Sequence, residues 1–432
     1  MAAPALPLTT DDFAALIAPL APSTGAMAVA VSGGADSMAL CLLAHRWASH
    51  TGRTVLALTV DHGLRPDSAA EATQVAGWLH RRGIRHAVLP WTGPKPTAGL
   101  QAAARATRYR LLAERCRAEG IADVMVAHHA GDQAETFVMR RERGSGPRGL
   151  AAMPAARHVD GIRVLRPLLP VPKGRLIATL QACGQDWAED PSNENQRFAR
   201  VRTRLVLASG SPSSTDRLAA LAHVHGVQRE QADAALTRLL AECAFPDPAG
   251  FCRIGLRELL AAPPAMATTV LARVVTTVGG LPYLPSDASA RRAVSALAAG
   301  RGHSLHRCVL WQTSVDEYVA CRELRGLDRR PIEPGSPVVW DARFLVAVAP
   351  GRGRPPALAV GPLGHSGWAQ VRPHVTSAIP HRARLVLPTV WSEERVVAVP
   401  HLQFGAEWGA TATFLPAESL APPHFAVVSA AE

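Results

Sequence analysis

Up to residue 208, short apolar runs alternate with amphipathic stretches, and this alternation constrains the fold more than any other feature of the chain. Four runs have the length and composition of strands: Met27–Ser32, Thr54–Asp61, Arg85–Pro90 and Asp123–Ala127. Three helical patterns lie between them: Ser37–His50, Ser68–Arg82 and Leu100–Glu119. Strands that alternate with helices are typical of a parallel sheet covered by helices. We therefore predict a doubly wound α/β domain, which binds ligands at the carboxyl ends of its strands.

Two further textures follow this region. Helical periodicity dominates residues 209–308, where apolar side chains recur every three positions at Leu218, Leu221, Val224 and Val227. From residue 309 onward, valine-rich runs bounded by glycine and proline predict strands: Val338–Val348, Arg384–Val390 and Val396–Val399. The sequence thus predicts three domains, an α/β domain over 1–208, a helical domain over 209–308 and a small β-rich C-terminal domain over 309–432.

The chain is basic, with 46 Lys and Arg residues against 35 Asp and Glu residues, a net charge of +11 and a sequence pI near 10.1. Such an excess favours a polyanionic partner through release of counterions. There is a second explanation, because Lys95 and Lys173 are the two lysines of the chain. A GC-rich genome that writes arginine for every soluble cation would produce the same excess, so charge alone leaves both explanations open.

Membrane and secreted classes are disfavoured. The sequence contains no run of about eighteen apolar residues, so no membrane-spanning helix is predicted. Its first residues lack a basic segment and include Asp11 and Asp12, which is unlike a signal peptide. The seven cysteines are scattered without a Cys-x-x-Cys pair, which indicates neither a disulfide framework nor a zinc ribbon. We expect a cytoplasmic protein.

A glycine-rich turn joins the first predicted strand to the first helix and reads Ser32-Gly33-Gly34-Ala35-Asp36-Ser37. The glycines permit a tight turn whose N–H groups, with the helix start, form a cradle for phosphate oxygens. The serines add hydroxyl donors, whereas Asp36 would repel a bare phosphate and is explained by a Mg²⁺ ion facing it. A plain glycine turn with a capping side chain is the alternative. The strand–turn–helix setting favours the phosphate site.

Two acidic residues follow the fourth predicted strand. Asp132 and Glu135 lie three positions apart, so a helix that starts here presents both on one face. Such a pair can hold Mg²⁺ or the amines of an amino acid, although acidic residues in a first helical turn also favour the helix dipole. The adjacent His128 and His129 point in opposite directions on an extended strand, so a histidine metal pair is not predicted.

Basic residues cluster on three short segments: Arg105 and Arg108; Arg140, Arg143 and Arg148; and Arg200 and Arg204. The first pair lies three positions apart on a predicted helix, so it can address one anion or form a solvated basic face. The second group surrounds a glycine-rich turn suited to an RNA phosphate or to pyrophosphate. The third pair lies one helical turn apart and can neutralise phosphate charge.

In this order the motifs resemble those of the PP-loop ATP pyrophosphatases, and within that superfamily those of the tRNA(Ile)-lysidine synthetases. The matching blocks are Ser32–Ser37, Val60–Arg65, Arg105–Tyr109, His128–Thr136, Arg140–Leu150 and Glu189–Arg204. The chain departs from the family pattern twice. Gly131 replaces the first acidic residue of a block that commonly reads His-His-x-Asp-Asp-Gln-x-Glu-Thr, and Val201 replaces an asparagine.

The resemblance implies a Rossmann-like PP-loop domain, a helical tRNA-binding domain and an enzyme that uses ATP and Mg²⁺. The implied reaction ligates free lysine to C2 of the wobble cytidine in the CAU anticodon of isoleucine tRNA. ATP adenylates the C2 oxygen with release of pyrophosphate, and lysine then displaces AMP. The product, lysidine, changes the codon and amino-acid specificity of the tRNA from methionine to isoleucine.

Site roles also follow from the resemblance. The implied catalytic residues are Asp36, Asp132, Glu135, Arg200 and Arg204. The implied ATP-binding residues are Ser32, Gly33, Gly34, Ala35, Asp36, Ser37, Asp61 and His62, with Asp36 and Asp132 as ligands of Mg²⁺. The implied tRNA-binding residues are Arg105, Arg108, Arg140, Arg143 and Arg148.

Three other functions use parts of the same pattern. A PP-loop sulfur transferase also adenylates tRNA, but such enzymes generally need paired or catalytic cysteines, and none here is suitably spaced. Ammonia-using synthetases of the superfamily fit the basic charge and the helical middle region less well. A non-catalytic RNA-binding protein would not need Asp36, Asp132 and Glu135 together, and ATP–pyrophosphate exchange would distinguish it from an enzyme.

Overall fold

The structure is a computed structural model that describes residues 5–96, 98–189, 199–208, 212–351 and 357–429. The chain divides into two compact units, residues 1–233 with 424–432, and residues 234–423. These limits differ from the predicted boundaries at 208/209 and 308/309.

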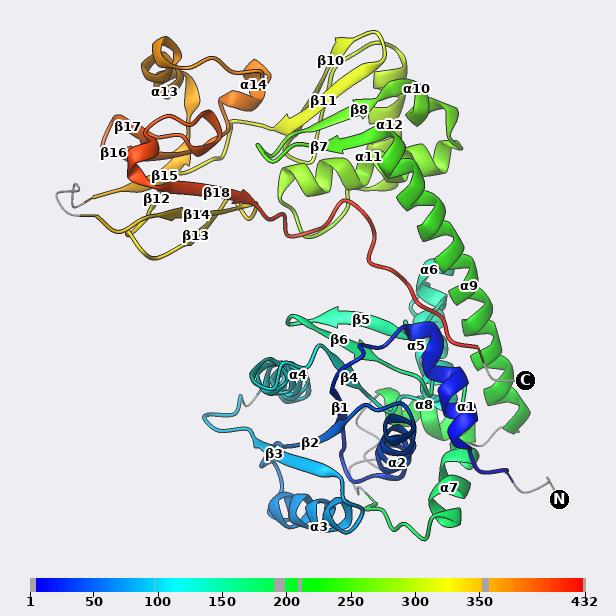
Figure 1. Cartoon of the computed structure of the whole chain (residues 1–432). Helices are drawn as coiled ribbons and strands as arrows, with labels where there is room; N and C mark the ends of the chain where they lie inside the picture. Colours follow the sequence, from blue (N-terminus) through cyan, green and yellow to red (C-terminus); the bar gives the residue numbers. More distant parts are fainter. Residues whose placement is uncertain (1–4, 97, 190–198, 209–211, 352–356, 430–432) are drawn as a thin grey trace. The chain divides into compact units, whose positions relative to one another are not determined.

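The first unit contains a six-stranded sheet in the order β3-β2-β1-β4-β6-β5 (Figure 1). The strands are β1 Met27–Ala30, β2 Val55–Asp61, β3 Arg85–Pro90, β4 Asp123–Met125, β5 Ala156–Val159 and β6 Ile162–Leu165. Neighbouring strands pair in parallel except β5, which runs antiparallel to β6 at the edge. This arrangement confirms the predicted doubly wound parallel sheet.

The helices of this unit are α1 Thr10–Ile17, α2 Ala35–His50, α3 Ser68–Arg81, α4 Leu100–Ala118, α5 Ala130–Glu142, α6 Pro147–Leu150, α7 Lys173–Ala182, α8 Ala199–Ala208 and the first part of α9 Pro212–Cys243. The four strands and three helices predicted from the sequence are confirmed to within two residues at each end. The long α9 continues into the second unit.

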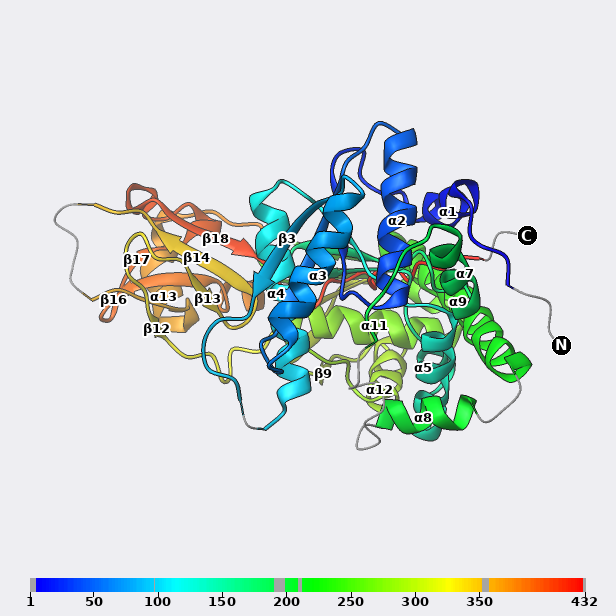
Figure 2. The same ribbon diagram turned by 90° about the horizontal axis from the view of Figure 1, so that it is seen from below.

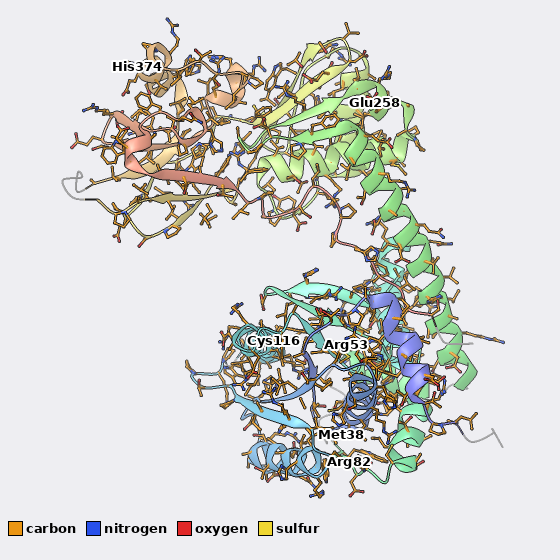
Figure 3. The ribbon with its side chains drawn as sticks, viewed as in Figure 1. Met38, Arg53, Arg82, Cys116, Glu258 and His374 are labelled. Carbon is orange, nitrogen blue, oxygen red and sulfur yellow. The ribbon has the colours of Figure 1, made fainter. Side chains whose placement is uncertain are left out.

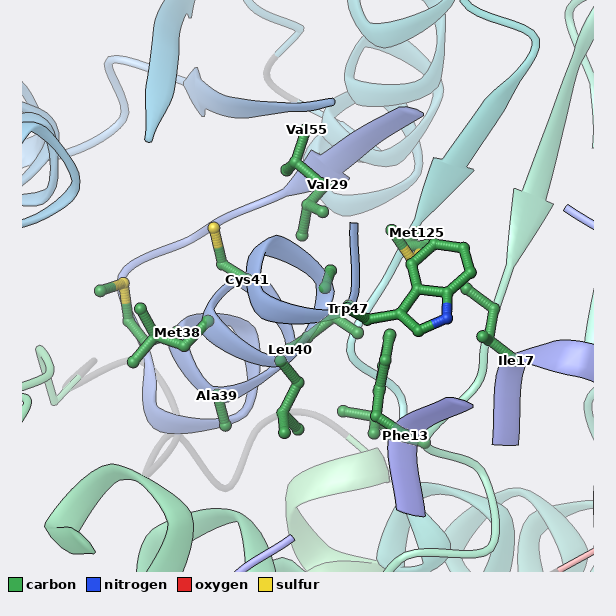
Figure 4. Packing of buried hydrophobic residues seen from close by; sticks show 14 of the residues in the cluster. Phe13, Ile17, Val29, Met38, Ala39, Leu40, Cys41, Trp47, Val55 and Met125 are labelled. Atoms are coloured by element: carbon green, nitrogen blue, oxygen red, sulfur yellow. The ribbon is translucent and has the colours of Figure 1, made fainter. Parts of the chain in front are cut away.

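Apolar side chains fill both faces of the parallel sheet. Along β1, Met27 and Val29 pack on one face with α1, α2, α3 and α7, whereas Ala28 faces the other side with α4. In the first core the rings of Phe13 and Trp47 pack edge to face, with their centroids 6.2 Å apart (Figure 4). Figure 3 labels one residue from each core, Met38 on α2 and Cys116 on α4. A sheet buried on both faces explains why its strands read as continuous apolar runs.

Residues 424–429 follow the second unit in the sequence but belong to the first unit. The N–H of Ala155 donates to the carbonyl of Ala426 at 2.8 Å. Ala426 and Val428 are buried in the same core as α1 and α2, and the guanidinium of Arg229 lies 4.3 Å from the ring centroid of Phe425. The core of the first unit is therefore built from both ends of the described chain.

The second unit begins with a five-stranded antiparallel sheet in the order β7-β8-β11-β10-β9. Its strands are β7 Ala244–Pro246, β8 Cys252–Gly255, β9 His303–Leu305, β10 Cys308–Ser314 and β11 Glu317–Arg322. The helices beside it are α10 Leu256–Ala261, α11 Pro264–Gly279 and α12 Asp287–Ala298. Helices were predicted here, but β7 and β8 were not, because strands this short form only by pairing: β7 pairs with β8, and β8 pairs with β11, far along the chain.

Two smaller sheets complete this unit, in the orders β12-β15-β16-β17 and β13-β14-β18. Their strands are β12 Arg330–Pro331, β13 Val338–Trp340, β14 Phe344–Val348, β15 Ala359–Pro362, β16 Pro388–Ser392, β17 Arg395–Ala398 and β18 Ala410–Phe414, with the helices α13 Gly364–Val371 and α14 His381–Arg384. The predicted β-rich character is confirmed, although the run 384–390 contains the end of a helix. Among the described residues, no helix has the length and apolarity needed to cross a bilayer.

Candidate active site

The loops that follow β1 and β4 lie beside each other, because these two strands are parallel neighbours. Ala28 and Val29 pair with Val124 and Met125. The next elements are α2 after β1 and α5 after β4, so two helix starts meet at one edge of the sheet. Such an edge, with helices leaving adjacent strands, is where open α/β sheets bind ligands.

The turn before α2 requires glycine and leaves the helix start open. Gly33 has φ +90°, and a Cβ on it would lie 2.8 Å from Cγ2 of Val75. Oγ of Ser37 accepts the N–H of Ser32 at 3.1 Å and donates to the carbonyl of Gly34 at 3.0 Å. No side chain of the described residues caps α2. Its first N–H groups are therefore available to an anion.

The start of α5 is closed by two side chains. Nδ1 of His129 accepts the N–H of Gly131 at 3.0 Å, and Oδ2 of Asp132 accepts the N–H of His129 at 3.0 Å. Because Nδ1 is an acceptor, the proton of the neutral ring is assigned to Nε2. This Nε2 lies 3.6 Å from Oδ2 of Asp36 and 3.7 Å from Oδ2 of Asp132. The imidazole thus stands between two carboxylates that come from different helices.

A third carboxylate and an arginine adjoin this pair, where α8 packs against α5 (Figure 2). Nε of Arg204 donates to Oε1 of Glu135 at 2.6 Å, and its Nη2 lies 4.0 Å from Oδ1 of Asp132. The hydrogen bond to Glu135 raises the pKa of Arg204 above its ordinary value, against the effect of burial, and the charges of Glu135, Asp132 and Asp36 add to the rise. The cluster therefore holds its one described cation firmly charged.

Comparison with known proteins identifies the family of the chain. The PP-loop domain family model matches residues 8–209. The tRNA(Ile)-lysidine synthase of Methylobacterium nodulans is 42% identical over 312 residues, which cover 68% of this chain and 90% of that protein. The enzyme of the same name from Ruegeria pomeroyi is 36% identical over 397 residues, 89% of this chain and 90% of that one. The chain belongs to the tRNA(Ile)-lysidine synthase family.

Solved structures of lower similarity include a U34-tRNA thiolase from Methanococcus maripaludis. It shares 14% sequence identity with the chain at a TM-score of 0.42, over 49% of this chain and 76% of the thiolase.

Within this lysidine synthase framework, the structure brings together Asp36, Asp132, Glu135 and Arg204, four of the five residues predicted to be catalytic. Arg200 belongs to the first turn of α8, but its side chain lies outside the described residues, as do residues 190–193 of the predicted Glu-Asp-Pro-Ser-Asn block. The residue directly before that block contacts the glycine turn, since the N–H of Ala188 donates to the carbonyl of Gly33 at 2.9 Å.

The predicted ATP contacts are Asp61, the last residue of β2, and His62, the residue directly after it. Oδ1 of Asp61 accepts a hydrogen bond from the N–H of Gly63 at 2.8 Å. The rings of His62 and Trp91 pack edge to face, with their centroids 6.0 Å apart. Burial lowers the pKa of His62, and the nearby cations Arg108 and Lys95 lower it further, against a smaller rise from Asp61. His62 is therefore a neutral ring beside basic residues.

Trp91 and Lys95, which lie beside His62, were not predicted to belong to the site. Nζ of Lys95 donates to the carbonyl of Gly63 at 2.5 Å and lies 5.8 Å from the ring centroid of Trp91. The rarity of lysine in this chain was the available signal.

The predicted tRNA-binding arginines fall into two groups. Arg105, Arg108 and Arg143 are exposed on α4 and at the end of α5. In contrast, Nη1 of Arg140 donates to the carbonyls of Gly149 and Ala152 at 2.6 and 2.8 Å. Nη2 of Arg148 lies 2.6 Å from Oδ1 of Asp233. Arg140 and Arg148 therefore also tie the glycine-rich turn to the protein, which the sequence did not reveal.

Proposed function

We propose that this chain ligates lysine to C2 of the wobble cytidine in the CAU anticodon of isoleucine tRNA, at the expense of ATP. The observation that carries the proposal is the meeting of Asp36, Asp132, Glu135 and Arg204 beside the open start of α2. The curated relatives named tRNA(Ile)-lysidine synthase support the substrate. The expectation of a cytoplasmic enzyme agrees with a tRNA substrate.

ATP would bind with its phosphates against the glycine turn. The residues Ser32, Gly33, Gly34, Ala35, Asp36 and Ser37 form this cradle, and the open N–H groups of α2 face it. Asp61 ends the neighbouring strand β2 and His62 follows it, where a neutral histidine can contact the nucleoside without adding charge. The proposed ATP site thus has an anion-binding turn for the phosphates and a separate surface at His62 for the nucleoside.

The residues present fit a Mg²⁺ ion between the phosphates and the carboxylates. Oδ1 of Asp36 is buried and has no hydrogen-bond partner among the described residues. No group of three or more His, Cys, Asp or Glu side chains in the described part of the chain could hold a metal alone. Mg²⁺ is commonly held by one or two carboxylates together with substrate phosphates, so Asp36 and Asp132 would suffice. Bound there, it would neutralise phosphate charge.

In the first step, the C2 oxygen of cytidine attacks the α-phosphorus of ATP, a new O–P bond forms and pyrophosphate leaves. Arg204, with Arg200 proposed beside it on α8, would stabilise the negative charge that develops on the phosphates. Because Arg204 is held by Glu135, its guanidinium is already oriented before the substrate binds.

In the second step, the ε-amine of lysine bonds to C2, the C2–O bond breaks and AMP departs with that oxygen. The amine must lose its protons during this step. The carboxylates of Asp132 and Glu135 would attract the lysine ammonium, and one of the two would accept a proton from it. Both steps need the two substrates held together, which is the main contribution of the protein.

The tRNA would lie along the basic residues of the first unit. Arg105 and Arg143 present exposed guanidinium groups for phosphates. Arg108 would meet a phosphate beside His62, whose Nε2 lies 3.4 Å from Nη2 of Arg108, and Arg140 and Arg148 would shape the adjoining turn. The helical region 209–308 is proposed to contribute further tRNA contacts. One wobble base offers too few contacts to separate two tRNAs that share an anticodon.

The decisive assay incubates the protein with ATP, labelled lysine and isoleucine tRNA bearing a CAU anticodon. We expect label in the RNA and one AMP per lysine incorporated. Methionine tRNA with the same anticodon is the control and should stay unlabelled. ATP–pyrophosphate exchange without incorporation of lysine would mean that the protein adenylates tRNA for another acceptor, which would contradict the proposal.

A further inference from the structure

Gly131 leaves room that the ring of His129 occupies. A Cβ built on Gly131 would lie 2.7 Å from Cε1 of His129 and 3.1 Å from its Nδ1. Non-bonded atoms do not approach this closely in a packed interior, so the present ring position and any side chain at residue 131 exclude each other. Gly131 is also the position at which the chain departs from the His-His-x-Asp-Asp block.

The ring is fixed by what it contacts. The N–H of Gly131 donates to Nδ1 at 3.0 Å, and the backbone N–H of His129 itself is bound by Asp132. The residue is 7% exposed. Nε2 of the ring lies 3.6 Å from Oδ2 of Asp36 and 3.7 Å from Oδ2 of Asp132, so its N–H dipole faces both carboxylates.

We infer that His129 is a positioning residue that keeps Asp36 and Asp132 turned toward each other, and that residue 131 is glycine because the ring needs its space. The inference rests on the proposed function of these two carboxylates. Asp36 belongs to α2 and Asp132 to α5, and two carboxylates that approach each other repel. An N–H dipole between them lowers this repulsion and links the two helix starts.

A purely structural role is the competing explanation, because Nδ1 of His129 also caps α5. The two ring nitrogens do different work, which makes the roles separable. An asparagine side chain can cap a helix through its oxygen but does not reach the position of Nε2. A glutamine is longer, and its amide N–H₂ can take the place of the Nε2 donor.

The first experiment is a double-mutant cycle with Gly131→Ala and His129→Ala, measured as the dissociation constant for ATP with Mg²⁺ by calorimetry and as kcat for lysidine formation. We expect Gly131→Ala to weaken ATP binding and to lower kcat, each about tenfold, by expelling the ring. In the double variant, Gly131→Ala should add less than about twofold to the effect of His129→Ala, because the ring is already absent.

Gly77→Ala is the matched control, a glycine inside α3 whose added Cβ would meet nothing closer than 3.7 Å. It should leave kcat unchanged and raise the Tm, as alanine does in an unconstrained helix. Additive effects of the two substitutions at Gly131 and His129 would overturn the inference. The ATP measurement needs neither tRNA nor lysine, so it stays valid if lysidine formation itself fails.

The second experiment compares His129→Asn with His129→Gln. We expect the asparagine variant to keep the Tm but lose about tenfold in kcat with little change in the KM for lysine. The glutamine variant should recover kcat to within about threefold of the unsubstituted protein. If kcat instead follows the Tm across both variants, His129 is only a helix cap and the inference fails.

Discussion

The two helix starts at the carboxyl edge of the sheet are opposites. The helix α2 follows Gly34, has no capping side chain among the described residues, and leaves its first N–H groups open. The helix α5 follows His129 and is closed by a capping box of His129 and Asp132. An open start attracts anions through its N–H groups, whereas a closed one presents the side chains that close it.

Because the two helix starts differ, one edge of the sheet can bind ligands of opposite charge. The glycine turn before α2 suits phosphates, and the carboxylates of Asp132 and Glu135 on α5 suit a metal ion or an ammonium group. Asp36 lies in the first turn of the open helix but faces the closed one, with Nε2 of His129 3.6 Å from its Oδ2. Asp36 therefore links the phosphate-binding turn before α2 to the carboxylates on α5.

The largest effect is expected when one of the two carboxylates between α2 and α5 loses its charge. We expect Asp36→Asn and Asp132→Asn each to lower kcat for lysidine formation by about 10³-fold, since each removes a carboxylate proposed to hold the Mg²⁺ that neutralises the phosphates. Asparagine at 132 still offers an oxygen to the N–H of His129, so the Tm should change little. Asp11→Asn, on the exposed side of α1, is the control and should be silent. Turnover near normal in either active-site variant would refute the assignment.

Removing the cation that the acidic cluster holds should have the next largest effect. Arg204→Gln leaves Glu135, which is 4% exposed, without its main described partner. We expect kcat to fall about 10²-fold and the free energy of unfolding to fall by about 1–3 kcal/mol. Steady-state rates and urea unfolding measure the two effects. A stability loss without a rate loss would show that Arg204 only neutralises Glu135.

The open helix start is tested by Gly33→Ala. The substitution forces alanine to φ +90° and brings its Cβ against Val75, so the turn must shift. We expect the dissociation constant for ATP to rise about tenfold, measured by calorimetry. Gly25→Ala, whose added Cβ meets nothing within 4 Å, should bind ATP normally. If both variants bind ATP as tightly as the unsubstituted protein, the turn does not cradle the phosphates.

The smallest effect separates two arginines of the glycine-rich turn. Arg143→Ala should weaken tRNA binding about two- to threefold and reduce the salt dependence of binding by the equivalent of about one phosphate contact, with the Tm unchanged. Arg140→Ala should instead lower the free energy of unfolding by about 1–3 kcal/mol, because two carbonyls lose their charged donor. Binding titrations over a salt series, with thermal unfolding of both variants, check the contrast. A reversed pattern would exchange the two roles.

Sequence pattern predicted much of this site because its parts are local. The glycine turn and the pair Asp132 and Glu135 each depend on residues a few positions apart, and the alternation of strands and helices placed them at one edge. What could not be predicted depends on contacts across the chain. His129 was treated as a strand residue, since only the folded loop shows its ring over Gly131. The engagement of Arg140 and Arg148 and the pairing of β8 with β11 are likewise tertiary.

The return of residues 424–429 to the first unit has a consequence for biogenesis. Protein domains usually begin to fold in the order in which they leave the ribosome. Here Ala426 and Val428, which complete the core around α1 and α2, are translated only after the whole second unit. Until then the nascent first unit lacks these buried side chains, and burial of a valine side chain alone contributes roughly 1.5–3 kcal/mol. The first unit can therefore complete its core only after residues 424–429 have been synthesised, and a chain that stops before them would carry the motifs of the family on an unfinished core.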